Sequence, residues 1–200
     1  AGMIAVFSVI LMIGFAVFKT PVLYAFGASE ATIGYAESYI EIYLIGTFFV
    51  QIAVGLNTFI SGQGESKTAM LSVVIGAVLN ICLDPVMIFG LKLGVRGAAL
   101  ATIISQAVSA AWVIRFLISK RSVMKLRLGN MRLRREVVKR IAGLGISPFI
   151  MQSTESMVSI TLNSGLQNYG GDLYVGTMSI MTSIMQLILI PVQGISQGVQ

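Results

Sequence analysis

The sequence predicts an all-α protein of the membrane, a polytopic bundle of transmembrane helices. Of its 200 residues, 56% are hydrophobic and only 11% are charged, and the mean hydropathy is +0.87. A soluble domain of this size does not carry so few charges. The apolar runs reach about 20 residues, the length that a helix needs to cross a hydrocarbon core. The strands of a barrel would be about ten residues long with alternating polarity, so helices remain as the spanning elements.

Six apolar spans follow one another along the chain, separated by segments rich in glycine and hydroxyl residues such as GASEATIGYA and SGQGESKT. A turn at Gly170-Gly171-Asp172 separates the last two spans. We expect three parts: four helices in 1–119, a loop in 120–140 and two more helices in 141–200. The predicted spans are 1–26, 37–60, 69–90, 97–119, 141–168 and 173–199.

The basic residues predict the orientation of the chain in the membrane. Ten of the 14 lysines and arginines fall between Arg115 and Arg140. Such a concentration in one loop places loop 120–140 in the cytoplasm and makes the chain a multi-pass protein of the cell membrane. Lys92 and Arg96 are exceptions, because they fall in a loop assigned to the outside. The charge therefore indicates orientation and contact with membrane lipids, and we expect no nucleic-acid partner.

The absent residue types argue against an enzyme. The chain has no histidine, the usual general base and a common metal ligand, and its single cysteine, Cys82, lies in an apolar run. No nucleophile–base pair or permanent metal site is visible, and no cofactor is expected. An integral membrane enzyme with catalytic groups outside this chain and a purely structural membrane subunit remain as alternatives.

The first candidate site is an acid inside the third span. Asp84 lies in the stretch NICLDPVMIFG, where a carboxylate at the centre of a span costs roughly 2.5–3.5 kcal/mol. Asn80 shares its helix face, and Thr102 lies at a comparable depth on the next, antiparallel span. These oxygen donors suit a small cation or a proton. In the competing interpretation, Pro85 loosens the helix and Asp84 satisfies the freed backbone groups or pairs with a neighbour.

The second candidate site is Glu155, midway along the fifth span. Gln152, Ser159 and Asn163 continue a polar stripe from it along one helix face. An acid at this depth is a functional-site hypothesis by default. The alternative is a neutral glutamate buried against a helix outside this chain. The candidates for a substrate cavity are Gln152, Asn163, Asn57 and Met181, and ordinary helix packing is the other interpretation for the methionine.

Two further stripes have structural interpretations. In the second span, tyrosines at every fourth position predict an interfacial aromatic belt, with Glu37 and Glu41 at headgroup level. In the fourth span, small residues at every fourth position predict close helix packing. The members of these stripes are Tyr35, Tyr39 and Tyr43, and Gly97, Ala101, Ser105 and Ser109.

Residues 55–106 resemble the third to sixth helices of the multidrug and toxic compound extrusion (MATE) transporters. The resemblance rests on the motif N-x-x-x-D-P at Asn80–Pro85, followed by GVRGAALATIISQ. The later stretches GISPFIMQSTESMVSITLNSGLQNYGGD and PVQGISQGVQ are similar to the seventh and eighth helices of that family. The likeness covers nearly the whole chain.

The resemblance implies a two-lobe fold of twelve helices, of which this chain would hold helices 3–8 as a piece of a longer protein. It also implies export of small cationic or amphipathic compounds in exchange for H⁺ or Na⁺ by alternating access, by a monomeric transporter when complete. Asn80, Asp84 and Thr102 match three residues of the first-lobe cation site, with Na⁺ as one candidate occupant. Glu155 matches a glutamate of helix 7 that some members use for ion coupling, so the resemblance makes both acids candidate coupling sites and leaves open which of them couples. A related branch of the superfamily flips lipid-linked sugars, which gives the alternative function.

Overall fold

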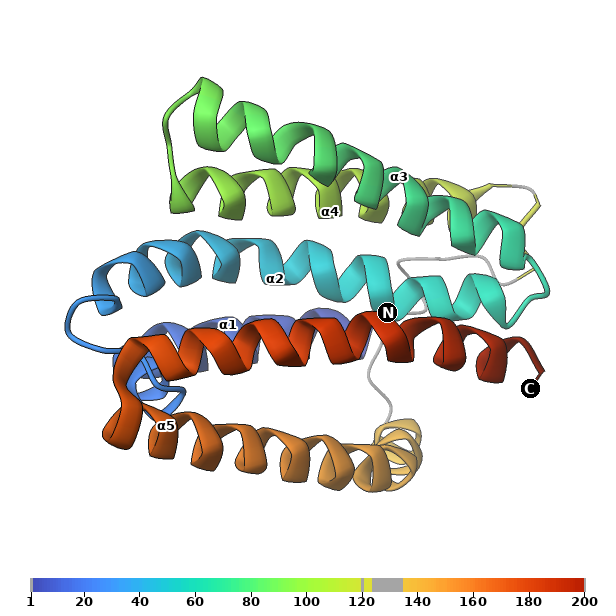
Figure 1. Ribbon diagram of the computed structural model, residues 1–200. Helices are drawn as coiled ribbons and strands as arrows, with labels where there is room; N and C mark the ends of the chain where they lie inside the picture. The colour runs from blue at the N-terminus through green and yellow to red at the C-terminus, as the bar shows by residue number, and fades with distance from the viewer. Residues whose placement is uncertain (1, 120, 124–134, 200) are drawn as a thin grey trace. The chain divides into compact units, whose positions relative to one another are not determined.

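The computed structural model describes residues 2–119, 121–123 and 135–199, and these residues form helices and no strand (Figure 1). This confirms the all-α prediction. In the described residues five helices are long and apolar enough to cross a membrane. The elements are α1 Gly2–Ala25, α2 Ile33–Ser61, α3 Ser66–Pro85, the π-helix η1 Val86–Gly90, α4 Val95–Ile118 and α5 Arg135–Val199.

Helix α5 contains both of the last two predicted spans. It has 65 residues, and a straight helix of that length would extend about 98 Å, several times the thickness of a bilayer core. The backbone leaves the helical region at Gly171, with φ 65° and ψ −165°. At that point the chain reverses, and the two arms of α5 run back along each other (Figure 1). The turn predicted at Gly170-Gly171-Asp172 is therefore present.

Internal contacts divide the chain into two compact units. The first comprises Ala1–Lys19 and Gly34–Ser147, and the second comprises Thr20–Ile33 and Pro148–Gln200. The end of α1 and the connection to α2 thus group with α5, although in sequence they lie among the four helices assigned to 1–119. Most of the predicted loop 120–140 lies outside the described residues.

Small residues bring α3 and α4 of the first unit close together. The predicted stripe on α4 is buried: Ala101 is fully inaccessible and Ser105 and Ser109 are almost so. A Cβ added to Gly76 of α3 would lie 2.3 Å from Ser109 Oγ, and that hydroxyl donates to the Ser72 carbonyl at 2.9 Å. The prediction that the stripe serves helix packing is confirmed.

The apolar core of the first unit gathers at one end of its helices. It joins the C-terminal halves of α2 and α4 to the first turn of α3, and Ile4 of α1 packs against it. Its buried members are Leu56, Ile60, Ala69, Val113 and Leu117. Because neighbouring helices alternate in direction, the start of α2, the end of α3 and the start of α4 meet at the opposite end. The candidate residues of the third and fourth spans lie there.

Candidate functional site

The structure brings Asn80, Asp84 and Thr102 together. The side-chain amide of Asn80 donates to Asp84 Oδ1 and to Thr102 Oγ1, each at 3.4 Å. All three residues are half-buried. Asn80 and Asp84 share a face of α3 because they lie four residues apart, and the close packing of α4 places Thr102 opposite them. We call these three residues the polar cluster.

The helix changes form directly after Asp84. Pro85 has no N–H for the carbonyl four residues earlier, and the backbone continues as the π-helix η1. The N–H of Leu91 bonds to the carbonyl of Val86 at 2.9 Å, which closes this wide turn. Single π-turns inside helices are frequent at functional sites. Within the described residues Asp84 bonds to the Asn80 side chain and not to freed backbone, so its orientation follows from the polar cluster.

Gly97 fixes the approach of η1 to α4. A Cβ at Gly97 would lie 2.7 Å from the carbonyl oxygen of Met87, and real Cβ atoms do not approach a backbone atom so closely. Only glycine therefore allows the first turn of α4 to contact η1 at this distance. Since Asp84 directly precedes η1 and Thr102 lies on α4, this contact helps to position the polar cluster.

Tyr39 of α2 joins the polar cluster, which the sequence analysis missed. Its phenol lies within electrostatic reach of both Thr102 and Asp84. Its ring stacks on Tyr43, with centroids 5.7 Å apart and an angle of 15° between the planes. Gly46 lies two helical turns after Tyr39 on the same helix face, and it packs against Ile103 of α4. The residue assigned to an aromatic belt thus faces α4.

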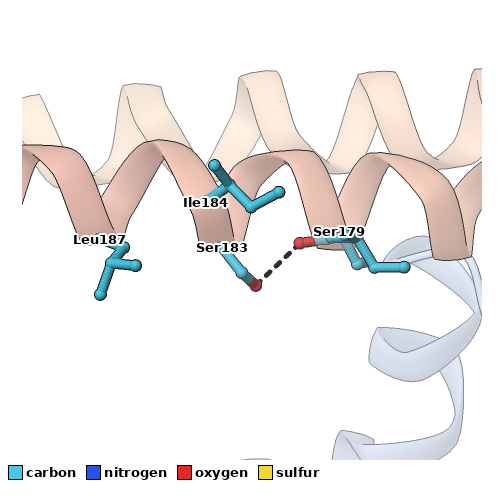
Figure 2. A pocket seen from close by; sticks show the side chains of 5 residues that line it. Ser179, Ser183, Ile184 and Leu187 are labelled. Atoms are coloured by element: carbon cyan, nitrogen blue, oxygen red, sulfur yellow. Dashed lines mark hydrogen bonds between the residues drawn. The ribbon is translucent and has the colours of Figure 1, made fainter.

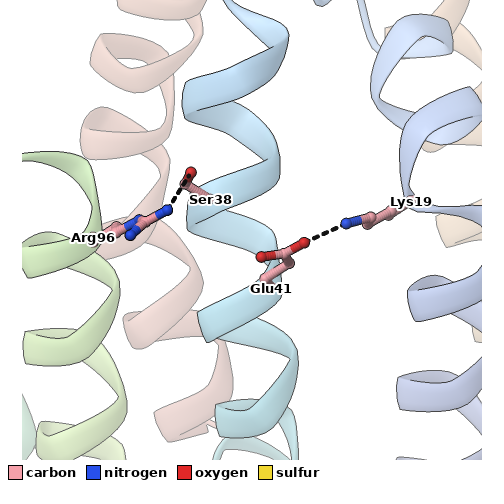
Figure 3. Close-up of polar contacts among 4 residues, drawn as sticks. All are labelled: Lys19, Ser38, Glu41 and Arg96. Carbon is pink, nitrogen blue, oxygen red and sulfur yellow. Dashed lines mark hydrogen bonds and ion pairs between the residues drawn. The ribbon is translucent and has the colours of Figure 1, made fainter.

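A second set of polar contacts lies at the same end of α1, α2 and α4. Lys19 forms an ion pair with Glu41, and the Arg96 guanidinium donates to Ser38 Oγ at 3.4 Å (Figure 3). Glu41 is also within electrostatic reach of Arg96. Arg96 is one of the two basic residues in a loop assigned to the outside of the membrane. Its charge is compensated locally by groups on α2. The orientation itself stays a prediction.

Glu155 is in a different environment from Asp84. Its Oε2 accepts a hydrogen bond from Gln152 Nε2 at 2.8 Å, and both side chains are exposed on α5. The contact is local to one helix and ties no second element to the acid. In the part of the chain that the structure describes, neither Asp84 nor Glu155 is paired with a lysine or arginine.

The other cavity candidates lie on α2 and on both arms of α5. Asn57 donates to the Ala69 carbonyl at 3.3 Å and so ties α2 to α3, at the apolar end of the first unit. Asn163 is half-buried on α5, where its backbone lies against Gly27. Met181 is exposed on the second arm of α5. The substrate cavity itself stays a prediction.

Two shallow grooves lie on α5. One, of about 390 Å³, follows one face of the second arm, where Ser183 Oγ donates to the Ser179 carbonyl at 2.8 Å (Figure 2). The other, of about 370 Å³, lies at the Gly171 turn and includes Tyr169 and Tyr174. Because the serine hydroxyls bond back to their own helix, the first groove offers a mainly apolar surface. Its lining is Ser179, Ile180, Ser183, Ile184 and Leu187.

The polar cluster offers oxygen donors to a small hard cation. Asp84 supplies a carboxylate and Thr102 a hydroxyl, and turning the Asn80 amide by 180° presents its oxygen to the same place. Three side-chain oxygens are fewer than the six or more that hard cations such as Ca²⁺ take, so other ligands would complete the shell. Protonation of Asp84 is the alternative way to neutralise the cluster.

An all-helical membrane bundle with an acid held among neutral oxygen donors has the features of a membrane transporter. The MatE family model matches residues 1–86. The multidrug export protein MepA of Staphylococcus saprophyticus is 29% identical over 198 residues, which cover 99% of this chain and 43% of the relative. The chain thus spans less than half the length of this relative.

Solved structures of a multidrug resistance MATE family transporter of the MOP superfamily also match. The inward-facing conformation has a TM-score of 0.86 at 28% identity and covers 96% of this chain and 44% of the transporter. The outward-facing conformation has a TM-score of 0.81 at 28% identity, over 96% and 43%. Over nearly its whole length the chain is therefore similar to transporters of the MATE family, which are not enzymes. Its apolar helices and these matches support a multi-pass protein of the cell membrane.

Proposed function

We propose that the complete protein is a secondary multidrug efflux transporter, which exchanges cationic or amphipathic compounds for H⁺ or Na⁺ by alternating access. The coupling ion binds at the polar cluster of Asn80, Asp84 and Thr102, with Tyr39 beside it. One observation carries the proposal: Asp84 is half-buried inside a span, hydrogen-bonded to a neutral partner, and has no basic partner in the described residues.

The physical argument concerns the charge of Asp84. An uncompensated carboxylate in a span is costly, and a fixed lysine or arginine would neutralise it permanently. Asp84 instead accepts a hydrogen bond from the neutral Asn80 amide, which also donates to the Thr102 hydroxyl, and the neutral Tyr39 phenol lies within electrostatic reach. A mobile cation or a proton therefore compensates the charge when bound and leaves it uncompensated when released. Such an ion shifts the equilibrium between two conformations by its difference in affinity for them.

The two acids take different roles in this proposal. Asp84 is bonded to a side chain that also bonds α4, so a change in its charge acts on contacts between helices. Glu155 is exposed and has a partner on its own helix, so it is accessible to a cationic substrate. We assign coupling to Asp84 and substrate attraction to Glu155 and Gln152. The name of the MepA relative supports multidrug compounds as the substrate class.

The direct test uses the complete protein in proteoliposomes loaded with a fluorescent organic cation. An imposed Na⁺ gradient or an imposed pH gradient, each at zero membrane potential, is expected to drive counter-movement of the dye. Dye movement whose rate depends on neither the Na⁺ gradient nor the pH gradient contradicts the proposal. A parallel assay with a fluorescent lipid-linked sugar tests the alternative: gradient-dependent flipping of that lipid without dye transport would replace export by a flippase function.

A further inference from the structure

The connection between α1 and α2 docks on α5. We call residues 20–33 the strap. Its contacts group it with Pro148–Gln200, whereas the rest of α1 and nearly all of α2 belong to the other unit. Close to one boundary of the strap, Phe18 interrupts the helical backbone of α1 with φ −103° and ψ 16°. At the other boundary lies Gly34, where an added Cβ would meet nothing within 4 Å.

A polar contact joins the strap to the turn between the arms of α5. Ser29 Oγ donates to Asp172 Oδ2 at 2.9 Å, and Gln167 Nε2 donates to Asp172 Oδ1 at 3.0 Å. Each carboxylate oxygen of Asp172 therefore accepts one hydrogen bond, one from the strap and one from α5 itself. A hydrogen bond to an ionised carboxylate is stronger than one between neutral groups. This contact is exposed, so water competes for both partners when the strap leaves.

A backbone contact supports the same docking. Gly27 has φ +95°, and a Cβ on it would lie 3.2 Å from the carbonyl oxygen of Asn163. Glycine satisfies both the backbone conformation and the close approach to α5. The strap is thus fitted to α5 at two points, Gly27 on Asn163 and Ser29 on Asp172.

The turn within the strap does not depend on Asp172. The N–H of Ser29 bonds to Thr32 Oγ1 at 2.9 Å, and the N–H of Thr32 bonds to Ser29 Oγ at 3.3 Å. These reciprocal bonds shape the turn before α2 from within. The bond to Asp172 can therefore break while the strap keeps its local conformation. The strap then moves as a unit, and the backbone break at Phe18 lies close to its first boundary.

We propose that the strap is a conformational latch: the Ser29–Asp172 bond holds it on α5 in one of the alternating states and is broken in the other. This inference rests on the proposed alternating-access function and adds a device that holds one state. A bond that exists in one state stabilises that state and shifts the equilibrium toward it. The orientation predicted from the basic residues places this contact on the outer side of the membrane.

The test uses the complete protein with Cys82→Ser, so that Ser29→Cys and Asp172→Cys supply the reactive thiols. A short bifunctional thiol reagent applied to membranes is expected to join residues 29 and 172. Joining is expected to reduce dye transport by about tenfold or more, since a locked state cannot cycle. With a disulfide-containing reagent, reduction restores transport. Each single cysteine variant, treated identically, is the control for modification without joining.

A second readout does not need transport. The rate of cross-linking is compared at acidic and alkaline pH and with and without Na⁺, and we expect a change of about fivefold or more between conditions. Equal rates in all conditions, no cross-link in any, or full transport by the cross-linked protein each overturn the latch. If the Cys82→Ser parent fails to transport while the rate still changes, the proposed function fails and the latch stands. Thr32→Ala, added to the protein that carries Ser29→Cys and Asp172→Cys, alters the turn but keeps both thiols; it is the matched control and is expected to leave cross-linking in place.

Discussion

The side-chain amide of Asn80 on α3 donates to the hydroxyl of Thr102 on α4 at 3.4 Å, across two antiparallel helices. The same amide donates to Asp84. The acid is therefore connected to α4 through one neutral side chain. A proton or cation bound at Asp84 changes the acceptor that this residue offers to the Asn80 amide. This change acts on the hydrogen bond from Asn80 to Thr102, and so on the contact between the two helices.

Tyr39→Phe tests the part of the polar cluster that comes from α2. The change removes the hydroxyl that lies near Thr102 and keeps the ring that stacks on Tyr43. Loss of a polar contact comparable to one hydrogen bond, about 0.5–1.5 kcal/mol, should raise the ion concentration for half-maximal transport about 2-fold to 10-fold. The measurement is dye transport against a titration of the coupling ion.

Tyr43→Phe is the matched control, since it removes a phenol hydroxyl one helical turn away and preserves the same stack. An unchanged ion dependence in Tyr39→Phe, or an equal effect of both variants, would place Tyr39 outside the ion site.

Gly97→Ala tests the packing that positions Asp84. The new Cβ would meet the Met87 carbonyl, so η1 must move away from α4. We expect a loss of about 1–3 kcal/mol in the free energy of unfolding, the range for overpacking, together with weaker ion coupling. A thermal denaturation series in detergent measures the first effect.

Gly14→Ala provides the comparison, because a Cβ there meets nothing within 4 Å. Alanine is the better helix former by roughly 0.5–1 kcal/mol, so this variant should be as stable as the parent or more stable. Equal stability of Gly97→Ala and the parent would contradict the close contact.

Glu155→Gln separates the two acids. The exposed carboxylate has a partner on its own helix, so its loss should leave ion-driven transport in place. The KM for a cationic dye is expected to rise by about threefold to tenfold, because an attraction of about 1 kcal/mol is removed, while the KM for a neutral amphipathic dye stays unchanged. Loss of gradient-driven transport of both dyes would assign coupling to Glu155 instead.

Much of the fold follows from composition and run length. Apolar length alone predicted the helices, and spacing alone predicted the buried stripe on α4 and the contact between Asn80 and Asp84, because a four-residue repeat fixes a helix face. Thr102, which comes from another helix, was predicted from its comparable depth on the next antiparallel span, and the resemblance to MATE transporters implied the same residue. The π-helix after Pro85 was not predicted, since it depends on how η1 meets Gly97.

Tertiary contacts account for what the sequence did not reveal. Tyr39 belongs to a stripe that also fits a headgroup belt, and only the packing of α2 on α4 distinguishes the two. The docking of the strap on α5 joins Ser29 to a residue 143 positions away, beyond any periodic pattern.

Asp84→Asn tests the central claim most directly. The amide has nearly the shape of the carboxylate and keeps an oxygen for the Asn80 donor, but it neither carries charge nor binds a proton at neutral pH. In proteoliposomes with an imposed ion gradient, the variant should express and fold as the parent does and show no gradient-driven dye export, while Glu41→Gln, an acid outside the polar cluster, retains it. Export at the parent's rate by Asp84→Asn would contradict the account.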